Sequence, residues 1–416
     1  MPEFRAPPGT HDVLPPESAR WKRLVALFSQ TVTRAGYGLV VSPMFEDVGV
    51  FERVGEGTDV VRKEMYAFKD KGGRDVALRP EGTASLVRAY IQHRPRPPFK
   101  AWYVAPSFRH ERPQAGRFRQ HHQLGVEALG TEDPDLDVEI VALAWSVVEQ
   151  LGLSRVTLLL NSLGDDVCRP GFLQDLSSFL EAHVDELCDE HRARYGQNPL
   201  RVLDCKRPQC QAATADAPRL VDSLCGPCRE HFDRVQRGLK LLDVPFEMQP
   251  RLVRGLDYYT RTTFELQAEA LDSAQNGVGG GGRYDTLAEA LGGPATPGIG
   301  FGLGIERLLL ACDAEEVFPA LAAAVDVWVI DTTGGEEALL LTHELRAAGV
   351  RADRSFDARS MKAQFKSADR SGAQVAIIIG HREAAESSVT VRDLVSGEQT
   401  AVARDVIADH VHGMLR

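Results

Sequence analysis

Hydrophobic residues along the chain follow two periods, and the way these periods alternate indicates a fold of helices and strands. Residues 17 to 35 predict a helix that ends at Gly36. The apolar stripe of this helix has helical spacing and consists of Trp21, Leu24, Val25, Phe28 and Val32. Residues 37 to 41 then predict a strand that stops at Pro43. This helix and strand either belong to the core or form a seam between two copies of the chain, and the pattern leaves both open.

Residues 108 to 127 predict an arginine-rich hairpin, around which the rest of the chain is organised. A strand pattern at 101–104 precedes it, and Gln123, Gly125 and Glu127 later alternate with apolar residues, as in a half-buried strand. The loop between these strands carries Arg109, Arg112, Arg117 and Arg119. Guanidinium groups bind phosphate in a bidentate manner and stay charged, so the hairpin suits a polyphosphate. The alternative is a charged hairpin that lies in solvent.

Residues 76 to 83 run from a strand pattern into the start of a helix. Thr83 is a plausible N-cap for that helix. Glu81 beside it has two interpretations: a negative charge placed at a helix N-terminus, or a carboxylate that holds the ammonium group of a ligand. The sequence pattern does not separate them.

A polar, helical stretch from about 165 to 245 interrupts the pattern after a predicted helix at 131–152 and a predicted strand at 155–161. It holds two pairs of cysteines, Cys205 with Cys210 and Cys225 with Cys228. Two paired thiols at this spacing are compatible with a tetrahedral zinc site, and free thiols without a metal are the favoured alternative. Cys-Gly-Pro-Cys is also a redox-type spacing, although no clear strand precedes it.

Two glycine-rich segments follow a sheet-like stretch at 252–267, which contains the polar residues Arg254, Tyr258 and Tyr259. The first, residues 277 to 285, lacks the acidic residue of a dinucleotide fingerprint and is interpreted as a strand that permits close approach of a ligand. The second, residues 298 to 308, passes from a strand into a helix. Arg307 lies in the first turns of this helix, where an anion also meets free backbone N–H groups.

Composition limits the class of protein. The chain has 416 residues, enough for two or three domains, with 43% hydrophobic and 26% charged residues. No apolar run is long enough to span a membrane and the N-terminus has no signal core, so a cytoplasmic protein is expected. The net charge of -11 argues against sequence-blind binding to nucleic acid. Seven cysteines in a chain of this length do not form a disulfide scaffold.

Residues 325 to 416, beyond a linker at 313–319, predict a small α/β domain of alternating strands and helices. Positive charge gathers in this domain of an otherwise acidic chain, at Arg346, Arg351, Arg354, Arg359, Lys362, Lys366 and Arg370. These residues form either a solvated face or a nucleic-acid footprint.

The chain closely resembles bacterial histidyl-tRNA synthetases, which are class II aminoacyl-tRNA synthetases. Residues 17 to 43, 108 to 127 and 298 to 308 are similar to the three motifs of the class. The stretches Leu252-Val-Arg-Gly-Leu-Asp-Tyr-Tyr and Gly279-Gly-Gly-Gly-Arg-Tyr-Asp resemble motifs specific for histidine. The resemblance implies an α+β catalytic domain at 1–322 built on an antiparallel six-stranded sheet, with a helical insertion at about 165–245. It also implies an α/β anticodon-binding domain at 325–416.

The resemblance further implies ATP-dependent activation of L-histidine, transfer to tRNA(His), a homodimer without a membrane partner, and Mg²⁺ accompanying ATP. The implied catalytic residues are Arg109, Arg254 and Arg307. The implied ATP-binding residues are Arg109, Glu111, Arg117 and Arg307. The implied histidine-binding residues are Glu81, Thr83, Gln123, Glu127, Tyr258 and Tyr259. His121 and His122 are interpreted as polar loop residues rather than bases, and no protein-bound metal is assigned. The alternative is a histidine-binding paralogue, the regulatory subunit of ATP phosphoribosyltransferase, which the three phosphate arginines and the C-terminal domain argue against.

Overall fold

The computed structural model describes residues 4–55, 60–196, 199–203, 205, 207–253, 258–271, 276–320, 325–356 and 359–415. The chain forms two compact units. Trp21–Pro319 makes up most of the first unit, and Ala320–Arg416 makes up most of the second. No helix among the described residues is both long enough and apolar enough to cross a membrane.

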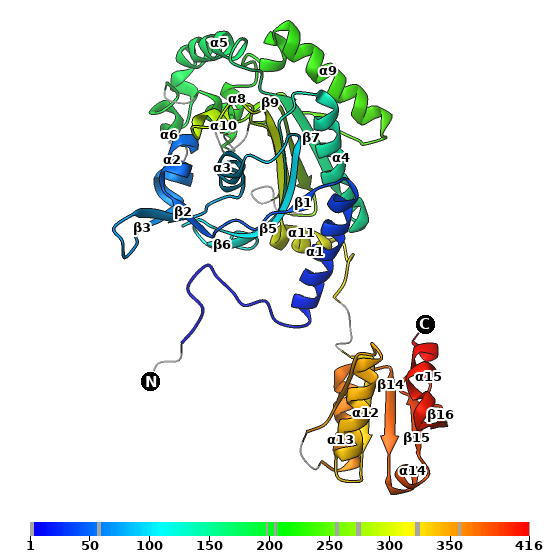
Figure 1. Cartoon of the computed structure of the whole chain (residues 1–416). Coiled ribbons are helices and arrows are strands. Elements are labelled where there is room, and N and C mark those ends of the chain that lie inside the picture. The colour runs from blue at the N-terminus through cyan, green and yellow to red at the C-terminus, as the bar shows by residue number, and fades with distance from the viewer. Residues whose placement is uncertain are drawn as a thin grey trace. The chain divides into compact units, whose positions relative to one another are not determined.

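An eight-stranded sheet forms the centre of the first unit (Figure 1). Its order is β1(Gly38–Leu39), β5(Phe99–Phe108), β6(Gln120–Leu129), β11(Gly298–Gly304), β10(Gly277–Arg283), β9(Thr260–Ala268), β7(Val156–Ser162) and β8(Glu247–Met248). The six strands from β5 to β7 pair antiparallel, which confirms the predicted antiparallel sheet. The two edge strands, β1 and β8, are short and pair parallel with their neighbours, so the sheet is wider than expected.

Strand β6 departs from the predicted half-buried pattern, since every residue from Leu124 to Leu129 is buried. One face, with Leu124 and Val126, packs into the main core beside the helices. The other face carries Gly125 and Glu127, and the apolar residues of a separate cluster cover it. The prediction of a half-buried strand was therefore wrong, because polar residues on a strand can face a buried site as well as solvent.

Helices α1(Glu17–Arg34), α4(Pro134–Gln150) and α11(Ile305–Ala314) contribute their apolar residues to this main core. In α1, Leu24, Phe28 and Val32 are fully buried, as the predicted stripe requires. Helix α4 begins where Asp133 accepts a hydrogen bond from the Asp135 amide, as in an ordinary N-cap.

A three-stranded sheet of β2(Phe45–Asp47), β4(Asp75–Leu78) and β3(Tyr66–Lys69) adjoins α2(Gly49–Gly55), the π-helical turn η1(Val60–Glu64) and α3(Thr83–His93). Thr83 is the first residue of α3 and not its N-cap, which is Gly82. The Glu81 carboxylate instead accepts hydrogen bonds from the amides of Thr83 at 2.6 Å and Ala84 at 2.8 Å. Glu81 thus satisfies the N-terminus of α3, and the N-cap prediction for Thr83 was wrong.

The polar stretch between β7 and β8 is helical, as predicted. It consists of α5(Arg169–Ala182), η2(Val184–Glu186), α6(Asp189–Arg192), α7(Leu200–Leu203), α8(Pro208–Ala213), η3(Leu220–Ser223) and α9(Gly226–Leu241). Figure 1 shows α5 and α9, drawn in green, at the same end of the first unit. A further short helix, α10(Leu287–Ala290), follows β10.

The second unit has a five-stranded mixed sheet in the order β13(Ala352–Arg354), β12(Val327–Asp331), β14(Val375–Ile379), β15(Ser388–Asp393) and β16(Gln399–Ala403). Its helices are α12(Glu336–Ala347), α13(Met361–Ser371), α14(His381–Ala385) and α15(Ile407–Met414), with the turn η4(Arg404–Val406). The prediction of an α/β unit is confirmed, but β16 was missed. Only Val402 of its five residues is buried, so this strand has no clear hydrophobic pattern.

One buried ion pair joins the main sheet to α4. Arg283 on β10 is fully buried, and its guanidinium binds the buried Asp137 carboxylate at 2.7 and 2.8 Å and Asp285 at 3.0 Å. Burial raises the pKa of Asp137 to about 6, although Arg283 opposes this effect.

We predict that Arg283→Ala lowers the free energy of unfolding of the first unit by about 3–5 kcal/mol, because the substitution leaves Asp137 buried without its partner. Denaturation in urea, followed by tryptophan fluorescence, measures the change. Arg234→Ala is the matched control, since Arg234 forms an exposed ion pair with Asp135 on the same helix and its loss has a much smaller effect. Equal effects of the two substitutions would contradict the importance of the buried pair.

Candidate active site

The floor of the site is a row of residues that crosses five strands of the large sheet. Strand register places in this row Tyr103, Gly125, Gly302, Gly280 and Glu265. Residues paired in register project from the same face of a sheet. The row has an aromatic side chain at one end and a carboxylate at the other, and the Tyr103 ring covers Gly125, where a Cβ atom would lie 2.0 Å from it.

A cavity of about 240 Å³ lies over this floor. Its lining includes both glycine strands, the hairpin loop and the start of α11: Arg109, Glu111, Gly116, Arg117, Phe118, His121, Gln123, Glu265, Gly277, Val278, Gly279, Gly302, Gly304, Glu306 and Arg307. The predicted ATP-binding residues Arg109, Glu111, Arg117 and Arg307 are all present, so segments far apart in sequence meet here.

Backbone carbonyl groups hold two of the cavity arginines in place. Arg109 Nε donates to the Pro80 carbonyl at 2.9 Å. Arg307 donates from Nε to the Gly116 carbonyl at 3.0 Å and from Nη1 to the Gly277 carbonyl at 2.8 Å. Burial lowers the pKa of both arginines, but a guanidinium stays charged in proteins. The cavity therefore has fixed positive charge, which favours an anion with several phosphate groups.

A cluster of hydroxyl groups surrounds the Glu127 carboxylate, which is only 1% exposed. Thr83 Oγ1 donates to Glu127 Oε1 at 2.6 Å, and Tyr103 Oη donates to the same oxygen at 3.3 Å. Tyr284 Oη donates to Oε2 at 2.5 Å. Burial nevertheless raises the pKa of Glu127 to about 8. In the absence of a cationic ligand, Glu127 is thus mostly protonated at neutral pH.

Gly300 on β11 makes the position of Glu127 possible. A Cβ atom at residue 300 would lie 1.9 Å from Glu127 Oε2, well inside van der Waals contact. Any larger residue at position 300 would therefore displace the carboxylate, so the glycine spacing in this strand serves the site directly.

Glu81 and the two predicted tyrosines lie beside this cluster. Burial raises the pKa of Glu81, while the Thr83 and Ala84 amides and Arg109 oppose this effect. The Tyr258 ring is 4.8 Å from that of Tyr259 and 6.0 Å from that of Tyr284. Burial raises the pKa of Tyr258, and Glu81 and Glu127 add to the increase, since both carboxylates are close to its hydroxyl. The site thus offers two acidic groups and several hydroxyls to a small polar ligand next to the arginine-lined cavity.

Comparison with known proteins identifies the family. A family model described as "Histidyl-tRNA synthetase" matches residues 9–178 and 181–308, which is well over half of the chain. The chain belongs to the histidyl-tRNA synthetase family. A second model of this comparison, described as "Anticodon binding domain", matches residues 325–413. The class II synthetase fold predicted from the three motifs is confirmed.

Relatives in this family match nearly the whole chain. A "Histidine--tRNA ligase" of Halothermothrix orenii is 45% identical over 96% of this chain and 97% of its own length. The same enzyme of Rhodococcus erythropolis is 48% identical over 98% and 97%. The crystal structure of the apo S. aureus histidyl-tRNA synthetase is 34% identical with a TM-score of 0.83 and covers 98% of this chain and 100% of that one. A Bacillus halodurans structure titled "ATP phosphoribosyltransferase regulatory subunit/histidyl-tRNA synthetase" has a TM-score of 0.65, but at 19% identity over 89% of this chain and 97% of that chain it shows the fold alone.

The two histidines of the hairpin lie on strand β6, not in the loop, so that part of their interpretation was wrong. His122 Nδ1 is 2.9 Å from Glu306 Oε1, and its backbone amide also donates to Glu306. His121 lines the cavity. Burial, with a further contribution from Arg109 and Arg307, lowers the pKa of His121 to about 3. It is therefore neutral at physiological pH and does not act as a general acid through an imidazolium form.

The predicted and observed site residues differ in two respects. Arg254 lies outside the described residues. Tyr103, Tyr284 and Glu265 belong to the site but were missed. Tyr284 follows Arg283 in a stretch that already stood out in the sequence, and Glu265 alternates with apolar residues on β9. Neither residue can be assigned to the site until it is known which strands are neighbours in the sheet.

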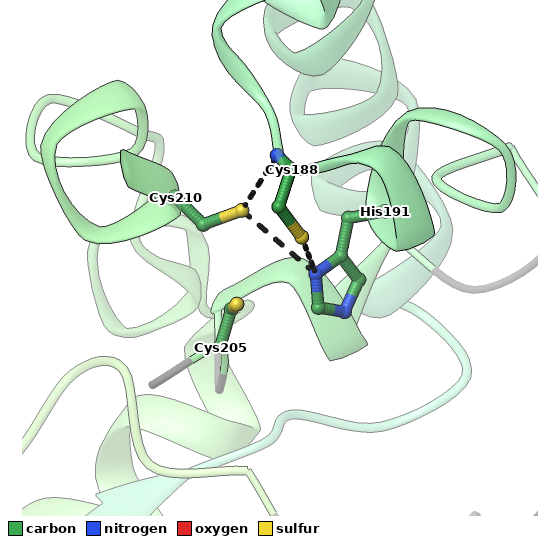
Figure 2. A group of neighbouring side chains, drawn as sticks. All are labelled: Cys188, His191, Cys205 and Cys210. Carbon is green, nitrogen blue, oxygen red and sulfur yellow. Dashed lines mark hydrogen bonds between the residues drawn. The ribbon is translucent and has the colours of Figure 1, made fainter. Parts of the chain in front are cut away.

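The four predicted cysteines do not form one group. Cys205 and Cys210 lie with Cys188 and His191, as Figure 2 shows. Cys225 and Cys228 lie in a different group, with Asp165 and Cys168. A 3-10 turn, η3, precedes Cys225 in place of a strand, so the redox-type interpretation is not supported. A single zinc site made of Cys205, Cys210, Cys225 and Cys228 is wrong, because paired sequence spacing does not specify which pairs meet.

We predict that the stability of the ligand-free protein depends on pH through Glu127. The folded state raises the pKa of this carboxyl from 4.5 to about 8, so burial of the neutral form contributes stability that is complete below pH 4.5. That contribution is lost as the pH rises towards about 8. Between these values the melting temperature of the wild type should fall relative to that of Glu127→Gln, which cannot ionise.

Thermal unfolding at several pH values, without histidine or ATP, measures this difference. Glu398→Gln is the control, because Glu398 is exposed and should follow the wild type at every pH. Parallel curves for the wild type and Glu127→Gln would show that the carboxyl does not titrate in this range.

Proposed function

We propose that the chain is a histidine–tRNA ligase that uses ATP to activate L-histidine and then transfers the histidyl group to the 3′ end of tRNA(His). The observation that carries this proposal is the arginine-lined cavity beside a buried acidic pocket, both on the glycine floor of the sheet. Family membership supports it, as do relatives of 45–48% identity that are named histidine–tRNA ligases. The chain is thus an enzyme of the aminoacyl-tRNA ligase class.

In the first step, a carboxylate oxygen of histidine attacks the α-phosphorus of ATP. A new O–P bond forms, the bond to the β-phosphate bridge breaks, and pyrophosphate leaves with its electron pair. This step needs two anions to be brought together and the developing charge to be stabilised, without a side-chain nucleophile. Arg109 would bind the α-phosphate and Arg307 the γ-phosphate. Arg254, by resemblance, would meet the charge at the reacting phosphorus.

In the second step, the terminal ribose hydroxyl of tRNA attacks the carbonyl carbon of the adenylate. The new ester forms as AMP leaves, and the hydroxyl proton is lost. Arg117 and Glu111, which form an ion pair within the hairpin loop, would have contacted ATP already in the first step. The pair gives Arg117 a fixed position next to the cavity.

Histidine would bind in the acidic pocket. Glu81, Thr83 and Gln123 would hold the α-ammonium group, Glu127 would accept from one ring nitrogen, and Tyr259 with Tyr258 would meet the other. Burial raises the pKa of both carboxylates, so a ligand with positive charge would stabilise their ionised forms. A ligand that cannot make both ring contacts leaves a buried polar group of the protein without a partner. This penalty supports selectivity of roughly 10⁴–10⁵-fold.

A divalent metal accompanies ATP in reactions of this kind, and we propose Mg²⁺. Carboxylate oxygens are the ligands that Mg²⁺ prefers, and Glu265 and Glu306 both line the cavity. When bound, the ion neutralises phosphate charge. Glu265 would contribute a carboxylate oxygen to it, whereas Glu306 already accepts hydrogen bonds from His122.

The regulatory paralogue is the weaker candidate. It would need the histidine pocket but not the positively charged cavity, whereas Arg109 and Arg307 are both held by backbone carbonyls in that cavity. The match of residues 325–413 to an anticodon-binding domain also favours the ligase.

We also propose a division of work along the chain. Residues 1–322 would carry catalysis, with the helical insertion at about 165–245, and residues 325–416 would bind the anticodon. A homodimer is supported by an apolar strip that is open to solvent in the single chain, Leu39, Val41, Met44 and Phe45. Val41 is 86% exposed, and a second copy of the chain would cover it. We propose a cytoplasmic location, in keeping with a role in translation.

Histidine-dependent exchange between ATP and radiolabelled pyrophosphate, with each of the twenty amino acids and no tRNA, tests the proposed function. We predict exchange with histidine alone. Arg307→Ala should reduce its rate by about 10²–10³-fold, because it removes positive charge from the reacting phosphates. Arg155→Ala is the control, as Arg155 is an exposed arginine outside the cavity. Histidine binding without any exchange would favour the regulatory paralogue instead.

The second unit offers a site for the anticodon. A hollow of about 610 Å³ lies at the N-terminal ends of α12 and α13, and Arg354 and Arg359 line it. The Arg354 guanidinium lies 4.9 Å from the centre of the exposed Phe356 ring. Helix N-termini and arginines attract phosphate, and an exposed aromatic ring can stack on an unpaired base.

We predict that replacing Arg354 and Arg359 together by Ala raises the KM for tRNA(His) at least about tenfold, since each phosphate or base contact is worth on the order of 1 kcal/mol. Pyrophosphate exchange should stay unchanged. Aminoacylation kinetics with transcribed tRNA(His) measure the effect. Arg382→Ala, an exposed arginine on α14 outside the hollow, is the matched control. An unchanged KM for tRNA would remove this hollow from the RNA interface.

A further inference from the structure

Three cysteines and one histidine of the helical insertion point their ligand atoms at a common centre (Figure 2). Cys188 and His191 lie at α6, Cys205 follows α7, and Cys210 lies in α8. The Sγ atom of Cys188 is 3.2 Å from His191 Nδ1, and that of Cys210 is 3.8 Å from the same nitrogen. The four ligand atoms all lie within 4.8 Å of one another.

These separations fit a tetrahedral metal ion. Zinc binds sulfur at about 2.3 Å and imidazole nitrogen at about 2.0–2.1 Å, so the corners of its tetrahedron are about 3.5–3.8 Å apart. The two distances to His191 Nδ1 lie close to this range, and the outer limit of 4.8 Å needs only a small inward shift of side chains. Three thiols and one imidazole are also a donor set that selects zinc among the common divalent ions.

The surroundings of the group suit a structural metal site. Cys188, Cys205 and Cys210 are all buried, and His191 is half-buried. The Cys188 amide donates to Cys210 Sγ at 3.2 Å, which fixes this sulfur and would stabilise it as a thiolate. The four side chains would fill all four coordination positions of a tetrahedral ion, so no position is left for a substrate.

The helices around the group are short, although Leu187, Val202 and Leu203 pack into the main core. Helices α6 and α7 have four residues each and α8 has six, too short to be stable without packing or cross-linking. Helices α6 and α8 each contain a ligand, and Cys205 lies two residues after α7. A bound ion would therefore cross-link three short helices that are separate in sequence, in addition to their packing against the main core.

We propose that Cys188, His191, Cys205 and Cys210 bind one structural Zn²⁺ ion that fixes the helical insertion. This site is separate from the catalytic cavity and does not depend on the function proposed above.

Hydrogen bonds of the α8 region connect the proposed metal site to the chain segment that precedes the active-site residues. The Thr214 hydroxyl donates to the Cys210 carbonyl at 2.7 Å, and the Arg251 guanidinium binds the same hydroxyl. Asn161 at the end of β7 donates to the carbonyls of Pro250 and Leu252, on either side of Arg251. The metal site thus supports the segment that leads into Arg254 and the tyrosine pair, and its loss would loosen that segment.

The second group, Asp165, Cys168, Cys225 and Cys228, is the weaker candidate. The Asp165 carboxylate already accepts hydrogen bonds from the amides of Val167 at 3.0 Å and Cys168 at 3.3 Å. Arg261 Nη2 lies 3.8 Å from the same carboxylate. Asp165 thus has partners that account for its position, whereas His191 turns its ring nitrogen towards two sulfur atoms.

Zinc-edge X-ray absorption of the full-length protein, purified without a histidine tag, tests the proposal on the wild type. We expect about one zinc ion per chain, with three sulfur atoms and one imidazole nitrogen in its first shell. The second group contains no histidine, so imidazole scattering identifies the site directly. Protein without zinc, or zinc without imidazole scattering, would overturn the assignment.

Two cysteine variants provide the matched comparison. Cys210→Ser should lose at least nine-tenths of the zinc, while Cys225→Ser should keep it, as measured by elemental analysis. Removal of zinc from the wild type by a chelator should lower its melting temperature, and added Zn²⁺ should restore it. Cys210→Ser that keeps its zinc would refute the site, as would a wild type whose melting temperature does not respond to the chelator.

Discussion

The burial of one carboxylate, Glu127, determines much of the architecture around the active site. A carboxyl group in a protein interior is costly unless its oxygens have hydrogen-bond partners, and here three hydroxyl groups from different elements provide them. Thr83 comes from α3, Tyr103 from β5 and Tyr284 from the segment after β10. These elements can meet only if β11 has no side chain beneath the carboxylate, which is why Gly300 faces it. The acidic pocket, the glycine strands and the placement of α3 are parts of one arrangement.

Charge is distributed unevenly in this acidic chain. The net charge is -11, yet the cavity collects Arg109, Arg117 and Arg307. Backbone carbonyls hold two of these side chains before any ligand arrives, so little reorganisation is needed when phosphate binds. Positive charge in the second unit is less available than the sequence suggested. Arg346 pairs with Asp353 and Arg351 with Asp326, which leaves Arg354 and Arg359 beside the hollow as the better candidates for RNA contact.

The sequence pattern predicted helices that have one buried face, such as α1, and also β12 and β14 of the second unit, whose residues are nearly all buried. It failed where burial has another cause. Strand β6 is buried on both faces because its polar side lines a site, and β16 was missed because four of its five residues are exposed. The arginines of the site were recognisable from resemblance, since each lies in a motif. Tyr103 and Glu265 were not, because their role comes from register between strands that are distant in sequence. The cysteine groups show the same limit. Their spacing in the sequence indicated two pairs, and only the fold shows which other residues complete each group.

The helical insertion separates two strands, β7 and β9, that are hydrogen-bonded neighbours in the sheet. Closing a loop of this length costs conformational entropy unless the loop is itself compact. All four proposed zinc ligands lie inside the insertion, so it can acquire its cross-link as soon as it leaves the ribosome and before β9 is made. The metal would then shorten the flexible part of the chain that connects the two strands. Zinc supply would thus influence how quickly the catalytic sheet closes during synthesis, and not only how stable the finished enzyme is.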